Sequence, residues 1–261
     1  MIEMIPIMII TLLLAGLASC SPLRTPLPLP TATPVPPTTT PTQTKVWFPP
    51  TPTFTLYPTQ TGVITPTVDV QPEYGEPLIV DNFDDPALWT KTRGPVGSVA
   101  MGVNELTIAI SSPRGYLYSQ RQGTQLGDFY AEMTASPSIC SGEDEYGMLL
   151  RVSPGFDFYR FSLTCDGQTR LDKYYKGTAS SPQALTYSSQ VPPGAPSMSR
   201  LGVWASGNEL HFYINDVYQF SVRDPSIASG TLGVFARAAG DGAVTVNYSE
   251  LVVYETRTSN E

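Results

Sequence analysis

The chain has 261 residues, with 15 lysines and arginines against 23 aspartates and glutamates, and its formal net charge is -8. No basic cluster interrupts this acidic composition, so the electrostatic attraction that nucleic-acid binding requires is missing, which argues against a DNA or RNA partner. Once residues 1–75 are set aside as leader and linker, about 185 residues remain, enough for one domain with a sizeable core.

The N-terminal segment has an apolar stretch from Ile5 to Leu17 that ends in Leu17-Ala18-Ser19-Cys20. This run resembles the lipobox of bacterial lipoproteins, in which the chain is cut before the cysteine and the cysteine receives the lipid. The resemblance implies a signal peptide over residues 1–19 and a lipid on Cys20 that anchors an extracytoplasmic protein to the bacterial cell membrane. An uncleaved membrane anchor is the alternative, although the apolar stretch is short for a membrane span.

The next segment is rich in proline and threonine. From Ser21 to Val68 the only charged residues are Arg24 and Lys45. Such a composition cannot bury a core and favours extended polyproline conformations, so residues 20–75 are predicted to form a disordered linker. The aromatic interruption Lys45-Val-Trp-Phe-Pro-Pro belongs either to a stalk that tolerates aromatic residues or to a docking segment for another envelope protein.

Beyond Pro72 the hydrophobic pattern has a period of two residues, and no segment has a convincing helical pattern. A short strand is expected at Leu78–Val80, followed by a turn that leads into one helical turn with Asp85 as N-cap, and Trp89 is expected to fold back on the core. Further strands are expected at Ser98–Val103, Glu105–Ile110, Tyr116–Ser119, Asp128–Ala135, Tyr146–Val152, Phe158–Thr164, Arg170–Tyr175, Arg200–Ala205, Glu209–Ile214, Val217–Val222, Leu232–Ala236 and Ala243–Tyr254.

Many short strands separated by regular turns predict an all-β, antiparallel two-sheet sandwich over residues 76–255, with a C-terminal tail at 256–261. Alternation then assigns side chains to faces. The apolar sets are expected in the core: Tyr146, Met148, Leu150 and Val152; Tyr159, Phe161 and Leu163; Leu201 and Val203; Leu210, Phe212 and Ile214.

The opposite sides of the same strands carry aromatic and hydrogen-bonding residues, which are expected to form one concave ligand-binding surface. Its members are Arg151, Arg160, Trp204, His211 and Tyr213, and Tyr174 of the strand Arg170–Tyr175 could join them. Aromatic rings beside planar hydrogen-bond donors suit sugars, whose C–H faces stack while their hydroxyls take directional bonds. The alternative is a solvated sheet face with scattered aromatic residues.

Several stretches resemble the concanavalin A-like lectin/glucanase superfamily, and most of all its laminin-G-like jelly rolls and the related domains of 3-keto-disaccharide hydrolases. They are Tyr146-Gly-Met-Leu-Leu-Arg151, Phe158-Tyr-Arg-Phe-Ser162, Asp166-Gly167, Arg200-Leu-Gly-Val203, Phe212-Tyr-Ile-Asn215 and Gly230-Thr-Leu-Gly-Val234. The likeness covers about Leu78 to Tyr254. It implies a jelly roll of two stacked sheets, one of them concave, with sugar recognition as the commonest activity.

Catalytic residues are not expected. Glucanases of the superfamily carry Glu-x-Asp-x-x-Glu or a shorter form on one strand, since retaining hydrolysis needs a nucleophile and an acid close together. The nearest stretch, Glu143-Asp-Glu145, places Gly147 or Met148 where the next acid should stand. His211 is the only histidine, which excludes a multi-histidine metal site and leaves one candidate for a Ser-His-Asp triad.

No cofactor is required, although Asp81, Asp84 and Asp85 could supply oxygen ligands to a structural Ca²⁺. The resemblance pairs them with an acidic residue of the last strand, where Glu250 stands. Capping by Asp85 is the more economical account of these residues.

The two cysteines after Cys20 form an even pair. A hairpin that joins the Tyr146 and Phe158 strands brings Cys140 and Cys165 to the same end, which predicts a disulfide in an oxidising compartment. Two buried, reduced thiols are the alternative.

The sequence therefore favours a lipid-anchored cell-surface module that binds polysaccharide or cell-wall glycan without cutting it. Two alternatives stay open: a structural or protein-partner-binding envelope domain, and a glycan-cleaving enzyme with an unrecognised site. The oligomeric state is not predicted.

Overall fold

A computed structural model of the chain describes residues 74–256. The predicted signal peptide, Cys20, nearly all of the Pro/Thr-rich linker and most of the C-terminal tail lie outside the described residues. Within them, no helix is long and apolar enough to span a membrane.

The described part of the chain is all β and contains fifteen strands. They are β1 (Tyr74–Asp81), β2 (Thr92–Gly94), β3 (Gly97–Met101), β4 (Leu106–Ile110), β5 (Tyr116–Gln120), β6 (Phe129–Ile139), β7 (Glu145–Val152), β8 (Phe158–Thr164), β9 (Gln168–Tyr175), β10 (Thr178–Tyr187), β11 (Ser199–Ser206), β12 (Glu209–Ile214), β13 (Val217–Arg223), β14 (Thr231–Arg237) and β15 (Val244–Thr256).

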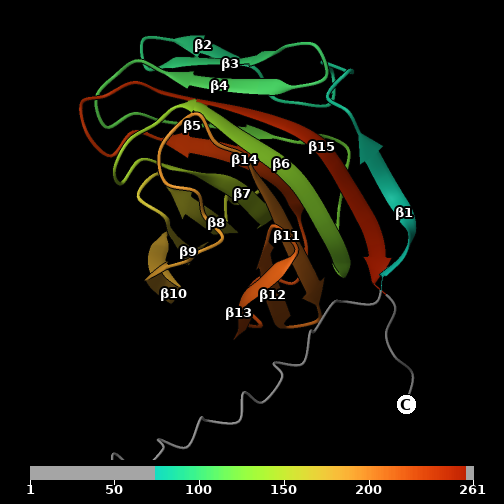
Figure 1. Cartoon of the computed structure of the whole chain (residues 1–261). Helices are drawn as coiled ribbons and strands as arrows, with labels where there is room; N and C mark the ends of the chain where they lie inside the picture. The colour runs from blue at the N-terminus through green and yellow to red at the C-terminus, as the bar shows by residue number, and fades with distance from the viewer. Residues whose placement is uncertain (1–73, 257–261) are drawn as a thin grey trace, which may run out of the picture. The chain divides into compact units, whose positions relative to one another are not determined.

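The strands form two antiparallel sheets. The nine-stranded sheet has the order β13-β12-β11-β6-β15-β4-β3-β2, with β1 also paired to β15, and the six-stranded sheet has the order β10-β9-β8-β7-β14-β5. Figure 1 shows the larger sheet curving around the smaller one. The predicted two-sheet antiparallel sandwich is therefore confirmed.

The core fills the space between the sheets, as the alternation predicts. Tyr146, Met148 and Leu150 of β7 are buried there, and the apolar sets of β8, β11 and β12 join them. A buried hydroxyl in this layer is satisfied, because Tyr248 Oη donates to the carbonyl of Phe235. The period-2 pattern is thus explained by burial of one side of each strand.

Two strands, β2 and β10, were not predicted from the sequence. β10 pairs with β9 at the edge of the six-stranded sheet, nearly all its residues are exposed, and Pro182 interrupts it. An edge strand that buries neither face has no hydrophobic alternation to detect.

The segment from Asp81 to Trp89 is a turn, so the predicted helical turn is wrong, but the predicted cap is present. The Asp85 carboxylate accepts a hydrogen bond from the amide of Ala87 at 2.8 Å. Trp89 folds back on the core as expected, is 2% exposed, and its Nε1 donates to Asp81 at 3.1 Å.

The predicted disulfide between Cys140 and Cys165 is confirmed, with the two Cα atoms 6.0 Å apart. β7 and β8 are paired in an antiparallel hairpin, which brings the residues that flank them to one end of the sheet.

Candidate functional site

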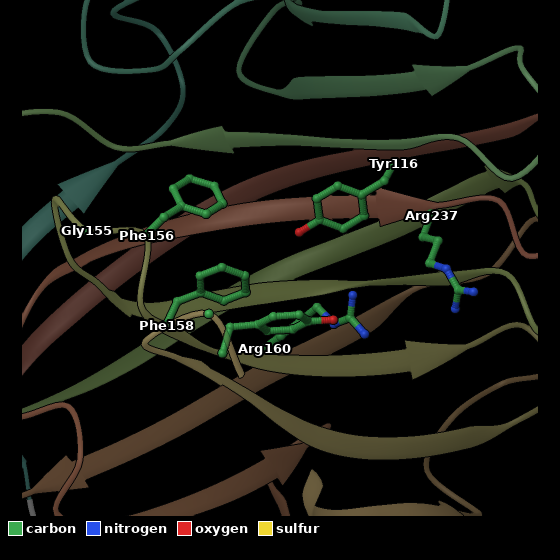
Figure 2. Close-up of a pocket in the computed structure, with 8 residues that line it drawn as sticks. Tyr116, Gly155, Phe156, Phe158, Arg160 and Arg237 are labelled. Carbon is green, nitrogen blue, oxygen red and sulfur yellow. The ribbon is translucent and has the colours of Figure 1, made fainter. Parts of the chain in front are cut away.

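The candidate site is an open pocket of about 540 Å³ on the outer face of the six-stranded sheet, the face turned away from the core (Figure 2). Strands β5, β8, β9 and β14 and the loop between β7 and β8 contribute to it. Its lining residues are Tyr116, Gly155, Phe156, Phe158, Arg160, Tyr174, Gly177 and Arg237.

Aromatic rings form one side of this pocket. Phe158 stacks on Tyr174 with ring centroids 4.7 Å apart, and Phe156 meets Phe158 edge-on at 5.3 Å. Beneath them Leu149 and Phe235 are fully buried in a second apolar cluster, outside the main core. This face is therefore an aromatic surface on an apolar base and not a solvated sheet face.

Two arginines, Arg160 and Arg237, also line the pocket, and they belong to an ion network beside it. Glu145 accepts from Arg170 at 2.8 Å and from Arg237, and Arg160 lies 3.6 Å from it. Arg160 also donates to Asp172 at 2.6 Å, and Arg170 pairs with the same carboxylate at 3.0 Å. Three guanidinium groups thus share two carboxylates, which leaves one positive charge in excess.

Arg160 stays charged in this setting. Burial alone lowers the pKa of its guanidinium, but the hydrogen bond to Asp172 and the charge of Glu145 outweigh burial, and the net shift of the pKa is upward. Its guanidinium carbon lies 5.3 Å from the Tyr174 ring centroid, within the range of a cation–π interaction.

Four buried polar atoms on this face have no hydrogen-bond partner in the described part of the chain: Tyr116 Oη, Arg160 Nε, Ser162 Oγ and Arg170 Nε, the last of which lies 3.0 Å from the Asp172 carboxylate. Burial raises the pKa of Tyr116 well above its ordinary value, and Arg160 offsets this only in part, so the phenol is a neutral donor. Figure 2 shows the Tyr116 hydroxyl pointing into the group formed by Phe156, Phe158 and Arg160. Buried polar atoms without a partner are uncommon in folded proteins.

Of the six residues predicted to share one surface, the structure brings together Arg160 and Tyr174. The alternation of β8 predicted the outward side of Arg160 correctly. Binding of a ligand by these two residues stays a prediction.

Arg151 lies elsewhere, because β7 contains a bulge. Between the pairs Gly233–Leu149 and Thr231–Val152, β7 advances three residues against two on β14, and Arg151 has a φ of 50°. A Cβ on Gly230 would lie 2.2 Å from the backbone of Arg151, so only glycine permits this approach. The extra residue reverses the alternation, and Val152 faces outward instead of into the core.

The Arg151 guanidinium is consequently fully buried and structural. It donates to the carbonyls of Gly127, Gly207 and Ile227 at 2.8, 3.0 and 2.9 Å. Gly127 precedes β6 and Gly207 lies between β11 and β12, so Arg151 ties β7 to loops of the other sheet. Its expected place beside Arg160 on a ligand surface is wrong.

Trp204, His211 and Tyr213 lie on β11 and β12, which belong to the nine-stranded sheet. Trp204 pairs with His211 across the strands, and their rings are 4.7 Å apart. The prediction of one surface is wrong for these three residues, because alternation gives the side of a strand but not the sheet to which the strand belongs.

Tyr116, Phe156 and Arg237 were missed by the sequence analysis. Tyr116 and Arg237 are partners across β5 and β14, a pairing between strands far apart in sequence. Phe156 carried a local signal, an aromatic residue directly after the turn Ser153-Pro-Gly155. It is 43% exposed, which core packing does not explain.

The acidic run before β7 has structural roles. Glu143 is exposed, and Asp144 accepts from the amides of Ser141 and Ala239, both at 2.9 Å. Glu145 is the one member that faces the pocket's ion network, where arginines occupy its oxygens. This arrangement occupies Asp144 and Glu145 and leaves the exposed Glu143, which does not line the pocket.

The four residues considered for calcium have protein partners or are exposed. Asp81 accepts from Trp89 and from Arg121, and Glu250 accepts from Thr134 at 2.9 Å. Asp85 caps its turn, and Asp84 is exposed. No group of three or more metal-ligating side chains was found among residues 74–256. The calcium site stays a prediction.

Solved structures with a similar fold include a carbohydrate-binding module and glucanases. A carbohydrate-binding module of Bacillus subtilis has a TM-score of 0.51 at 16% identity, with 64% of this chain and 96% of that chain covered. A Bacillus licheniformis beta-glucanase has a TM-score of 0.53 at 13% identity, with 71% and 100% covered. The catalytic domain of an endo-1,3-beta-glucanase of Thermotoga petrophila has a TM-score of 0.52 at 10% identity, with 72% and 100% covered.

No protein-family model matches the chain, and no curated protein matches it in sequence. At identities this low the similar structures establish the fold, a two-sheet jelly-roll sandwich, and nothing finer.

Proposed function

We propose that this protein is a lipid-anchored, extracytoplasmic module that binds glycan in the pocket on the outer face of its six-stranded sheet, without cleaving it. The observation that carries the proposal is the convergence of aromatic rings and guanidinium groups in one open pocket. Sugar rings stack their C–H faces on aromatic side chains, and their hydroxyls accept from fixed donors such as Arg160 and Arg237. The fold shared with a carbohydrate-binding module and with glucanases supports the proposal.

The test is binding of the full-length chain, purified in detergent, to a panel of polysaccharides by affinity electrophoresis. Phe156→Ala should lower the affinity for the retained glycan about tenfold, or about 1.4 kcal/mol, because it removes an exposed ring that lines the pocket. Tyr187→Ala is the matched control, since Tyr187 is more exposed, at 72%, and does not line the pocket.

Trp204→Ala tests which of the two sheets binds the glycan. It should leave the affinity unchanged, because Trp204 belongs to the nine-stranded sheet. A loss of affinity in Trp204→Ala with none in Phe156→Ala would place the glycan on the other sheet and reject the pocket.

The non-catalytic part of the proposal rests on the occupied oxygens of Glu145. Release of reducing sugar from the same panel is expected to be absent. Release that disappears in Glu145→Gln would identify a hydrolase instead.

The lipid anchor rests on the run Leu17-Ala18-Ser19-Cys20. Mass spectrometry of the N-terminal peptide should find Cys20 first in the mature chain and lipidated. An unmodified Cys20, or a chain that still carries Met1, would reject this part of the proposal.

A further inference from the structure

The charge of the pocket is unlike that of the protein around it. Two of its eight lining residues are arginines and none is acidic, although the whole chain has a net charge of -8. A positive pocket in an acidic protein favours a particular kind of ligand over neutral sugars in general.

Arg237 is the most exposed arginine of the ion network. It shares the Glu145 carboxylate with Arg170 and Arg160, whose side chains are less exposed. Among residues 74–256 only its Nη1 has a hydrogen-bond partner, and its side chain is 41% exposed. Figure 2 places it across the pocket from Phe156, with Tyr116 and Arg160 between them.

We propose that the ligand is an acidic sugar, a glycan whose residues carry a carboxylate or a sulfate. This inference rests on the proposed function of the pocket. The sugar ring stacks at the exposed Phe156, and its anionic group accepts hydrogen bonds from the nitrogens of Arg237 that Glu145 does not occupy.

The chemistry of arginine supports this assignment. Its planar fork matches the two oxygens of a carboxylate or sulfate, and charge-assisted hydrogen bonds are about twice as strong as neutral ones. The phenol of Tyr116, the cross-strand partner of Arg237, stays neutral and therefore does not repel an anion. A neutral sugar offers these nitrogens hydroxyl oxygens instead of a charged acceptor, and its hydrogen bonds to them are correspondingly weaker.

The experiment compares polymers that differ in charge alone. Polygalacturonate is paired with its methyl ester, and dextran sulfate with dextran, and binding of the full-length chain is measured by isothermal titration. At least one acidic polymer should bind about tenfold more tightly than its neutral partner, a difference of about 1.4 kcal/mol. The first pair reports on carboxylate and the second on sulfate. The net negative charge of the protein works against non-specific attraction to either polyanion.

The variant test uses two arginines. Arg237→Gln should remove the preference for the acidic polymer and keep the remaining affinity for its neutral partner. Arg223→Gln, at an arginine whose side chain is 71% exposed on the other sheet, should keep the preference. Melting temperatures of both variants report whether the fold is intact.

Equal affinity for charged and neutral polymers, or an unchanged preference in Arg237→Gln, would overturn the inference and leave the proposed glycan binding standing. If the chain binds neither acidic polymer but retains a neutral glycan from the panel, the inference is likewise overturned and the proposed glycan binding stands. Failure to bind any glycan would overturn both.

Discussion

Replacing Arg151 by methionine should destabilise the domain by about 3 kcal/mol while leaving the pocket unaltered. Methionine fills much of the space of the arginine stem, so the main loss is hydrogen bonding. The carbonyl of Ile227 would be left buried without a donor, at a cost of about 1–3 kcal/mol. The carbonyls of Gly127 and Gly207 are partly accessible and regain water, so each costs less, roughly 0.5 kcal/mol.

Urea unfolding followed by tryptophan fluorescence measures this loss. With a slope of about 2 kcal/mol per molar urea, the midpoint should fall by about 1.5 M. Arg223→Met is the control, because its exposed side chain makes one ion pair with Glu209 and should contribute no more than about 0.5 kcal/mol. A loss below about 1 kcal/mol for Arg151→Met, or a selective loss of glycan affinity at unchanged stability, would refute the structural role assigned to Arg151.

Two further predictions concern stability. Cys140→Ala with Cys165→Ala should cost up to about 3.5 kcal/mol for a separation of 25 residues, and no reactive thiol from this pair should be found in the denatured, unreduced chain. Burial alone would raise the pKa of Asp224, but bonds from Lys173 and Ser226 outweigh it and lower the pKa from 3.8 to about 2. The folded state therefore gains stability from ionised Asp224 above about pH 4 and loses it as the pH falls towards 2. Unfolding free energies measured between pH 2 and 6 should fall less steeply at low pH in Asp224→Asn than in the parent, and identical profiles would contradict this assignment.

The strand pattern was predictable because burial acts on every second residue. The spans predicted around β8 and β12 agree with the structure to the residue, since both strands alternate without interruption between turns. The disulfide was predictable for the same reason: a hairpin fixes which ends of its strands meet. β10 was not predictable, because a strand exposed on both faces has no alternation of apolar and polar residues.

The site was predictable only where it depends on one strand. Arg160 was found from alternation within β8, and Tyr174, on the neighbouring strand β9, was added without such an assignment. Alternation within β7 could not predict the bulge at Arg151. The bulge depends on the close approach of Gly230, which is distant in sequence. Tyr116 and Arg237 meet through the pairing of β5 with β14, and Trp204 is separated from them through the order of strands in two sheets. Long-range pairing is information that local pattern does not contain.

The central claim is that glycan binds on the outer face of the six-stranded sheet. Amide chemical-shift perturbation in the full-length chain tests it directly, with a short oligosaccharide of whichever polymer binds as the titrant. If glycan binds to this face, the amide signals perturbed by the oligosaccharide should belong to β5, β8, β9, β14 and the turn around Phe156. Shifts confined to β11, β12 and β13, around Trp204 and His211, would contradict it.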